Sequence, residues 1–324
     1  LLVMPAELLD QRFDSAYMHT LSFGRPGANP WKVQILNRSL PVPRVATEQC
    51  LQLLGQWGKV FPQEETFAQT KFGVPSLLVR LDCVWTKDAG LQVYEIEDRP
   101  AGVGISLVIN QQFKALFGQL RLEWPEFSVV VSPLRWPHGG DDHLWAKEIS
   151  FQKARESTGL LWVRAEPWEQ EFHAFAPRSL STVATEGMKS YGVPLRLWSE
   201  ISHAEAQNDP SCFPWDEGFC IKPLQGSKTQ KVLIWNPAVE SPQSRGKVLA
   251  HVKSLGRAHL QRLIPPMPME IGGVSYNVIY RVFFGWSPKS AQWIPLGGEW
   301  EARPAPQYLI HGALDAVTGP SSLL

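Results

Sequence analysis

The sequence has no excess of charge of either sign, because 31 lysines and arginines balance 31 aspartates and glutamates over 324 residues. It also has no run rich in lysine and arginine. A neutral chain exerts no net electrostatic attraction on nucleic acid or on an anionic membrane surface. The composition therefore predicts neither of them as a partner and favours a protein that acts on small molecules.

Cysteine is scarce as well, with four residues and no C-x-x-C pair or histidine at metal-binding spacing. We expect scattered thiols in a reducing compartment, without disulfides or a zinc site. No apolar run approaches the roughly 18 residues of a membrane helix, and no signal peptide is recognisable at the start. These features predict a cytoplasmic location. The chain also lacks a serine-hydrolase elbow, a Rossmann glycine fingerprint and a Walker loop.

The alternation of helical and extended patterns predicts an α/β (α+β) chain in three parts. The first is an irregular N-terminal arm followed by a helix, the second a hairpin followed by an α/β region, and the third a region of strands that ends in a loop-rich tail from Pro288. The predicted boundaries are 1–75, 76–170 and 171–324. Helices are expected at 46–58 and 106–120, and strands at 127–133, 160–165, 218–223, 231–237 and 274–286.

The hairpin carries the clearest group of charged residues. Its first strand contains Arg80-x-Asp82 and its second contains Glu95-x-Glu97. Since side chains two apart in a strand share a face, pairing brings the three carboxylates together. Such a group is favourable with a cation among it, and Mg²⁺ prefers oxygen ligands of this kind. The alternative is a solvated hairpin face with surface ion pairs.

The segments RLDCVW and LQVYEIEDRPAGVG resemble the metal-binding hairpin of glutathionylspermidine synthases and eukaryotic-type glutathione synthetases. The resemblance implies that Asp82, Glu95 and Glu97 hold Mg²⁺, and that Arg80 stabilises the transition state leading to an acyl phosphate. Glu97 stands where these families usually have asparagine. The number of Mg²⁺ ions is not indicated.

The segment GFCIKPLQGSKTQKV resembles the strand–loop–strand of ATP-grasp enzymes, in which a lysine on a strand and a flexible loop meet the phosphates of ATP. This resemblance implies that Lys222 binds phosphate and that the loop contributes Gly226, Ser227 and Lys228. The loop is poorer in glycine than the family pattern. Arg178 stands where the family has its first phosphate-binding lysine, and arginine binds phosphate with a different geometry from lysine.

Three later segments also resemble this family. HLQRLIPP resembles the strand whose backbone reads adenine, which implies a role for Gln261, Arg262 and Leu263. YNVIYRVFFG resembles the next strand, with Arg281 facing the phosphate or acyl site. LGGEWEARPAPQ resembles a glycine-rich loop that closes over substrate, with an arginine after the glycines, which implies that Arg303 grips a substrate carboxylate or phosphate.

The order of these segments implies an ATP-grasp fold with circularly permuted order, because the metal hairpin precedes the lysine strand. The implied function is that of an ATP-dependent carboxylate–amine ligase, which uses ATP and Mg²⁺ and proceeds through an acyl phosphate. Alternatives are a small-molecule kinase, a non-catalytic relative that binds nucleotide or a partner protein, and a tryptophan-rich protein that binds carbohydrate or peptide. The sequence indicates neither the carboxylate and amine substrates nor the oligomeric state.

Overall fold

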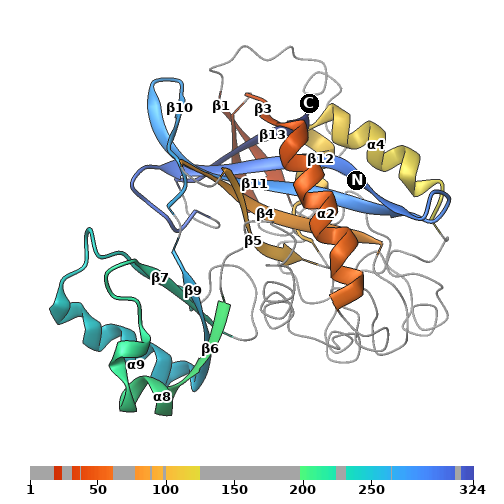
Figure 1. Ribbon diagram of the computed structural model, residues 1–324. Coiled ribbons are helices and arrows are strands. Elements are labelled where there is room, and N and C mark those ends of the chain that lie inside the picture. The colour runs from red at the N-terminus through yellow and green to blue at the C-terminus, as the bar shows by residue number, and fades with distance from the viewer. Residues whose placement is uncertain are drawn as a thin grey trace.

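The computed structural model of the chain describes ten stretches of residues, which form two β-sheets and the helices that pack on them (Figure 1). The described stretches are 18–23, 31–36, 38–60, 77–87, 90–97, 100–124, 198–223, 231–263, 265–310 and 315–324. A mixed α+β class is thereby confirmed at this coarse level. The ATP-grasp fold and the permuted order stay predictions.

The larger sheet has nine strands, of which seven follow one another in the order β1-β2-β13-β12-β11-β4-β5, while β3 pairs with β13 and β10 with β11. Its pairs are antiparallel, except that β13 runs parallel to β2 and β3. The strands are β1 (Met18–Phe23), β2 (Trp31–Leu36), β3 (Leu40–Val42), β4 (Leu78–Thr86), β5 (Gly90–Glu97), β10 (Met269–Ile271), β11 (Val274–Ser287), β12 (Gln292–Pro304) and β13 (Val317–Leu323).

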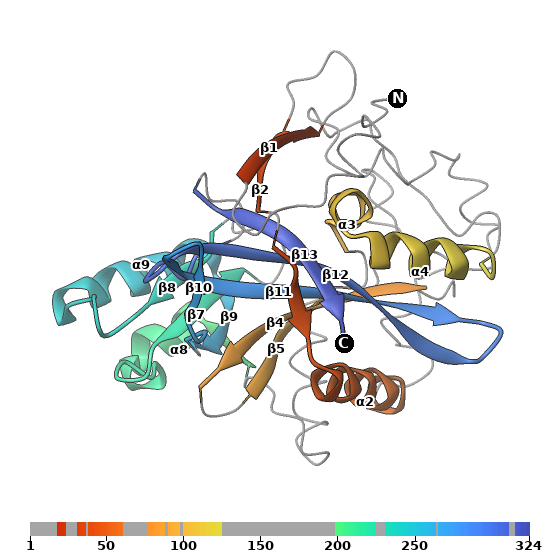
Figure 2. The same ribbon diagram turned by 90° about the horizontal axis from the view of Figure 1, so that it is seen from above.

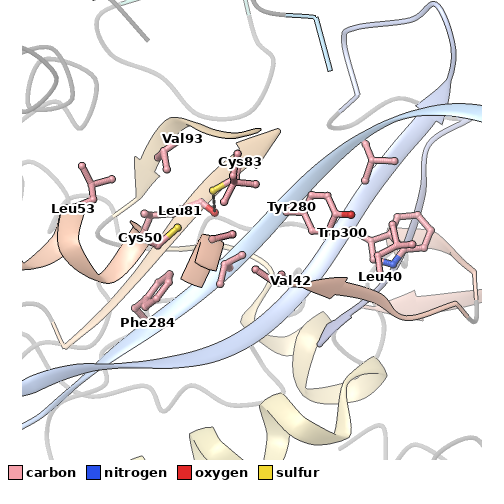
Figure 3. Packing of buried hydrophobic residues seen from close by; sticks show 14 of the residues in the cluster. Leu40, Val42, Cys50, Leu53, Leu81, Cys83, Val93, Tyr280, Phe284 and Trp300 are labelled. Carbon is pink, nitrogen blue, oxygen red and sulfur yellow. Dashed lines mark hydrogen bonds between the residues drawn. The ribbon is translucent and has the colours of Figure 1, made fainter. Parts of the chain in front are cut away.

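One face of this sheet packs against helix α2 (Arg44–Val60), which crosses in front of the strands in Figure 1 and lies on one side of the sheet, away from α4, in Figure 2. The apolar residues Ala46, Cys50, Leu53 and Leu54 recur at the spacing of one helical face, and all four are buried. Figure 3 shows Cys50 and Leu53 near Leu81, Cys83 and Phe284, with Tyr280 and Trp300 farther along the same core. The helix predicted at 46–58 is confirmed.

The opposite face carries α3 (Val103–Ile109) and α4 (Gln111–Arg121) where one helix over 106–120 was predicted (Figure 2). The single-helix prediction is wrong because Asn110 adopts an extended backbone. Its Oδ1 caps α4 by accepting from the amide of Phe113, and its Nδ2 donates to the carbonyl oxygens of Gly298 and Ser321 at 2.8 Å each. The buried amide thus ties the helix pair to β12 and β13.

The smaller sheet has four antiparallel strands in the order β6-β9-β7-β8 and is accompanied by helices α8 and α9 (Figure 1). Its interior is aromatic, with Phe213, Phe219 and Trp235 buried beside one another. The bounds are β6 (Trp198–Ser202), α8 (His203–Asn208), β7 (Phe219–Pro223), β8 (Leu233–Trp235), α9 (Arg245–Leu255) and β9 (Arg257–Arg262).

Two predictions about the ends of the chain are wrong. Part of the supposed irregular arm forms β1, β2 and β3, and the supposed loop-rich tail forms β12 and β13 inside the sheet. Gly297 and Gly298 lie within β12, where a Cβ on Gly298 would come within 2.1 Å of the carbonyl oxygen of Arg281. Glycine in this strand therefore reflects close packing of the backbone and not a closing loop.

The larger sheet takes strands from all three predicted segments of the chain, whose boundaries stay a prediction. The strands predicted at 127–133 and 160–165 lie outside the described residues. None of the helices in the described stretches combines the length and apolarity needed to cross a membrane.

Candidate functional site

The hairpin is formed by β4 and β5, which pair in the predicted antiparallel way. Arg80 lies opposite Glu97, and Asp82 lies opposite Glu95. Because residues directly opposite each other in an antiparallel pair share a face, the four positions lie on one face of the sheet. Figure 3 shows Leu81 and Cys83, the alternate residues of β4, on the other face against α2.

Arg80 and Asp82 form a buried bidentate pair on this face. The Nε and Nη2 atoms of Arg80 donate to the two carboxylate oxygens of Asp82 at 2.6 Å and 2.9 Å. Arg80 is 1% exposed and Asp82 3%. The alternative of a solvated hairpin face is therefore wrong for these two residues. Arg80 also donates from Nη1 to the carbonyl oxygen of Ala101, just before α3, at 2.5 Å.

Arg281 continues the charged row on β11, opposite Asp82 on one side and Glu299 on the other. Its Nη1 donates to Glu299 at 3.2 Å and to Glu301 at 2.7 Å, while its Nε lies 3.9 Å from the nearer oxygen of Asp82. Burial acts to lower the pKa of this guanidinium, but Glu301, Asp82 and Glu299 outweigh it and the pKa is raised. Arg281 is thus a buried cation held by three carboxylates.

Glu299 and Glu301 were missed as site residues in the sequence. Both are buried on β12, on the face opposite to that of Trp300, which lies in the core beneath α2. The signal was present, since the segment Glu-Trp-Glu-Ala-Arg puts charged side chains on every second residue. The prediction of a loop for this segment is wrong, because a loop does not show this alternation and the segment lies in β12.

The larger sheet meets the smaller one at Lys222 of β7. Its Nζ lies 3.7 Å from a carboxylate oxygen of Glu95 on β5, and the two side chains are 8% and 22% exposed. The resemblances imply that the lysine binds phosphate and the glutamate binds Mg²⁺ at one site, although the two residues are far apart in the chain. The structure brings them together from two sheets.

The residues predicted to read adenine lie on β9 and just after it, beside β7. Gln261 is buried and lies opposite Cys220, while Arg262 is exposed and forms an ion pair with Glu217. The amide of Leu263 donates to the carbonyl oxygen of Gly218 at 3.1 Å. The strand itself is therefore confirmed, and its contact with adenine stays a prediction.

Arg303 lies farther along β12, on the face of Glu301. It donates to Asp315 at 2.7 Å and to the carbonyl oxygen of Leu309 at 3.0 Å. Its predicted role in gripping a substrate is not tested by these contacts. Outside the described residues or side chains lie Arg178, Gly226, Ser227, Lys228 and the side chain of Glu97.

The oxygen donors on this face suit Mg²⁺ chemically, since Mg²⁺ takes carboxylate oxygens. Among the described side chains, however, no three Asp, Glu, His or Cys residues are grouped closely enough to hold a metal ion. Both oxygens of Asp82 are already bound by Arg80. Glu95 is partly exposed at the margin of the row and is the described carboxylate best situated to meet a metal ion that arrives with a ligand.

Comparisons with known proteins give no family for the chain. No protein-family model matches it, and no curated protein matches it. Among solved structures it is similar to a provisionally named gamma-glutamylcysteine synthetase from Methylobacillus flagellatus KT, with 11% identity, a TM-score of 0.41, and coverage of 85% of this chain and 84% of that one. At this level of similarity the neighbour's name says nothing about the activity of this chain.

Proposed function

We propose that the protein is an ATP-dependent carboxylate–amine ligase that forms an amide bond through an acyl-phosphate intermediate, on an ATP-grasp fold of circularly permuted order. The observation that carries the proposal is the 3.7 Å approach of Lys222 to Glu95. A lysine suited to phosphate and a carboxylate suited to Mg²⁺ meet there, beside the buried row of Arg80, Asp82 and Arg281.

The chemistry asks mainly for positioning and charge neutralisation. Transfer of the γ-phosphoryl group to a carboxylate spreads negative charge over the phosphate oxygens, and fixed cations stabilise that charge. In the proposal Lys222 faces the phosphates of ATP and Arg80 faces the developing acyl phosphate. The rigid strands β4 and β7 hold these two side chains, which keeps reorganisation small during the reaction.

Mg²⁺ would be held by Glu95 and Glu97 at the open margin of the hairpin, with Asp82 beside them, and when bound it would neutralise phosphate charge. Further nucleotide contacts in the proposal come from Arg178, Lys228 and the loop residues Gly226 and Ser227. The adenine would lie along Gln261, Arg262 and Leu263, and Arg303 would grip a substrate group. A small-molecule carboxylate and an amine are the proposed substrates.

The test uses hydroxylamine as a general amine, because it converts an acyl phosphate into a stable hydroxamate and releases phosphate. The protein is incubated with ATP, Mg²⁺ and each standard amino acid in turn, and both hydroxamate and ADP are measured. The ligase proposal expects hydroxamate for at least one carboxylate, and its loss in Lys222→Met. ADP release without hydroxamate would indicate a kinase that acts on another group.

A nucleotide-binding protein without ligase activity is the second candidate. It is favoured by the bidentate hold of Arg80 on Asp82, which occupies a carboxylate that the ligase family uses for metal. This candidate expects ATP to bind while neither ADP nor hydroxamate forms with any carboxylate. The same incubation therefore separates it from the ligase.

A further inference from the structure

Arg281 stands in the middle of a line of charged contacts that crosses three strands. Glu299 and Glu301 of β12 accept from its Nη1, and Asp82 of β4 lies on its other side at 3.9 Å from Nε. Asp82 in turn binds Arg80 through both oxygens. The resemblance implies that Arg281 faces the phosphate or acyl site, yet the groups that surround it in the structure are carboxylates.

Both ends of this charged row, Arg80 and Glu299, lie against the backbone at the start of α3. Arg80 donates to the carbonyl oxygen of Ala101, and the next residue is Gly102, at which an added Cβ would lie 2.4 Å from Oε1 of Glu299. The two ends of the charged line therefore meet the same two residues of backbone. The same short segment therefore accepts a hydrogen bond from Arg80 and lies close to the carboxylate of Glu299.

We propose that Arg281, Glu299 and Glu301 are positioning residues that hold Asp82 and, through it, set the orientation of Arg80. This inference rests on the proposed function for the role of Arg80, but the contacts that carry it do not depend on that role. Arg281 then acts on the reaction through Arg80 and does not itself touch ATP or substrate.

The charges of the row explain why its side chains hold one another in position. Two guanidinium groups face three carboxylates in the row, and all five side chains are buried. Charges in such surroundings keep their geometry only while their partners are present, because an unpaired buried charge is costly. Replacing Glu301 by glutamine balances the row instead of leaving a cation unpaired, so this variant is expected to fold.

The direct test follows the Nε–Hε signal of Arg80 by nitrogen–proton correlation NMR, with the signal assigned by its loss in Arg80→Lys. The variant Glu301→Gln should shift the Arg80 signal although Glu301 has its contact with Arg281. The matched control is Glu48→Gln, an exposed glutamate paired with Arg44 on α2, which should leave the signal unchanged. If Glu301→Gln moves the signal of Arg281 and not that of Arg80, the positioning role is wrong.

A second readout is the hydroxamate assay. Misorientation of Arg80 should lower kcat for hydroxamate formation in Glu301→Gln, by up to about a hundredfold, with KM for ATP unchanged. A raised KM for ATP with unchanged kcat would overturn the proposal, since it would mean that this end of the row binds the nucleotide. If the wild-type protein forms no hydroxamate, the ligase proposal fails, and the NMR measurement alone decides on the positioning role.

Discussion

Replacing the buried Gly102 by alanine should perturb the charged row more than the addition of a single methyl group suggests. Gly102 has φ of +87° and ψ of 0°, a left-handed conformation that costs alanine about 1–2 kcal/mol. Its new Cβ would lie 2.4 Å from Oε1 of Glu299. That oxygen is the end of a flexible side chain, but the side chain is buried and bound to Arg281, so it cannot yield freely.

The expected cost follows from the two effects together. The carboxylate must retreat by about 1 Å to restore an ordinary contact, which removes or distorts its hydrogen bond to Arg281. A hydrogen bond to a charged group contributes about 1.5–3 kcal/mol. We therefore expect Gly102→Ala to lower the free energy of unfolding by about 2.5–5 kcal/mol, of which only the conformational part of about 1–2 kcal/mol is independent of Glu299.

The assay is urea unfolding, followed by tryptophan fluorescence, on Gly102→Ala and a matched control. Gly273 serves as the control, because its φ is +79° and nothing lies within 4 Å of an added Cβ. Gly273→Ala should show the conformational cost alone. The double variant Gly102→Ala/Glu299→Asp has a side chain at 299 that is shorter by one methylene. It should therefore recover part of the unfolding free energy that Gly102→Ala loses beyond the loss in Gly273→Ala. Equal losses in Gly102→Ala and Gly273→Ala would refute the reasoning about Glu299.

Three further predictions concern other parts of the structure. Hydrogen bonds from the hydroxyl and amide of Ser202 lower the pKa of Glu205, so the stabilisation by this carboxylate is present above the usual carboxyl pKa and is lost as the pH falls. The melting temperatures of wild type and Glu205→Gln should therefore converge on acidification, and a difference that stays constant would contradict this. Burial raises the pKa of Tyr280 to about 12, so between about pH 10 and that value the folded state retains a proton that the unfolded state loses. In this pH range the melting temperature of wild type should fall more steeply with pH than that of Tyr280→Phe. The same pH dependence in both proteins would contradict the prediction. Asn110→Ala removes three hydrogen bonds of a buried side chain, to Gly298, Ser321 and Phe113, and should lower the free energy of unfolding in urea by at least about 3 kcal/mol. A loss below about 1 kcal/mol would mean that the contact of Asn110 with the sheet contributes little to stability.

The elements with strong local patterns were predictable. The β4–β5 hairpin, helix α2, and the strands β7 and β11 follow from periodicity, because each buries one face or a continuous apolar run. The pairing of Arg80 and Asp82 on one face was also predictable. The meeting of Lys222 with Glu95 was implied only by resemblance, since no local pattern relates residues on different sheets.

The misses have physical causes that the local pattern conceals. Glycine at 297 and 298 indicated a loop, but there it accommodates the backbone of the neighbouring strand. Asn110 lies in the middle of a helical pattern and interrupts it, because its side-chain amide caps α4 at Phe113 and donates to Gly298 and Ser321 of the sheet. Glu299 and Glu301 became meaningful only when β12 was seen beside Arg281, and strand order is a long-range property.

The central claim is that Lys222 and Glu95 belong to one site for ATP and Mg²⁺, and thermal unfolding with these ligands tests it most directly. At ATP about a hundredfold above its Kd, binding should stabilise the protein by about 2.7 kcal/mol. The account predicts a rise in melting temperature that requires Mg²⁺ in wild type and in the control Glu48→Gln, and that is largely lost in both Lys222→Met and Glu95→Gln. A rise that is the same in all four proteins, or no rise in any of them, would contradict the account.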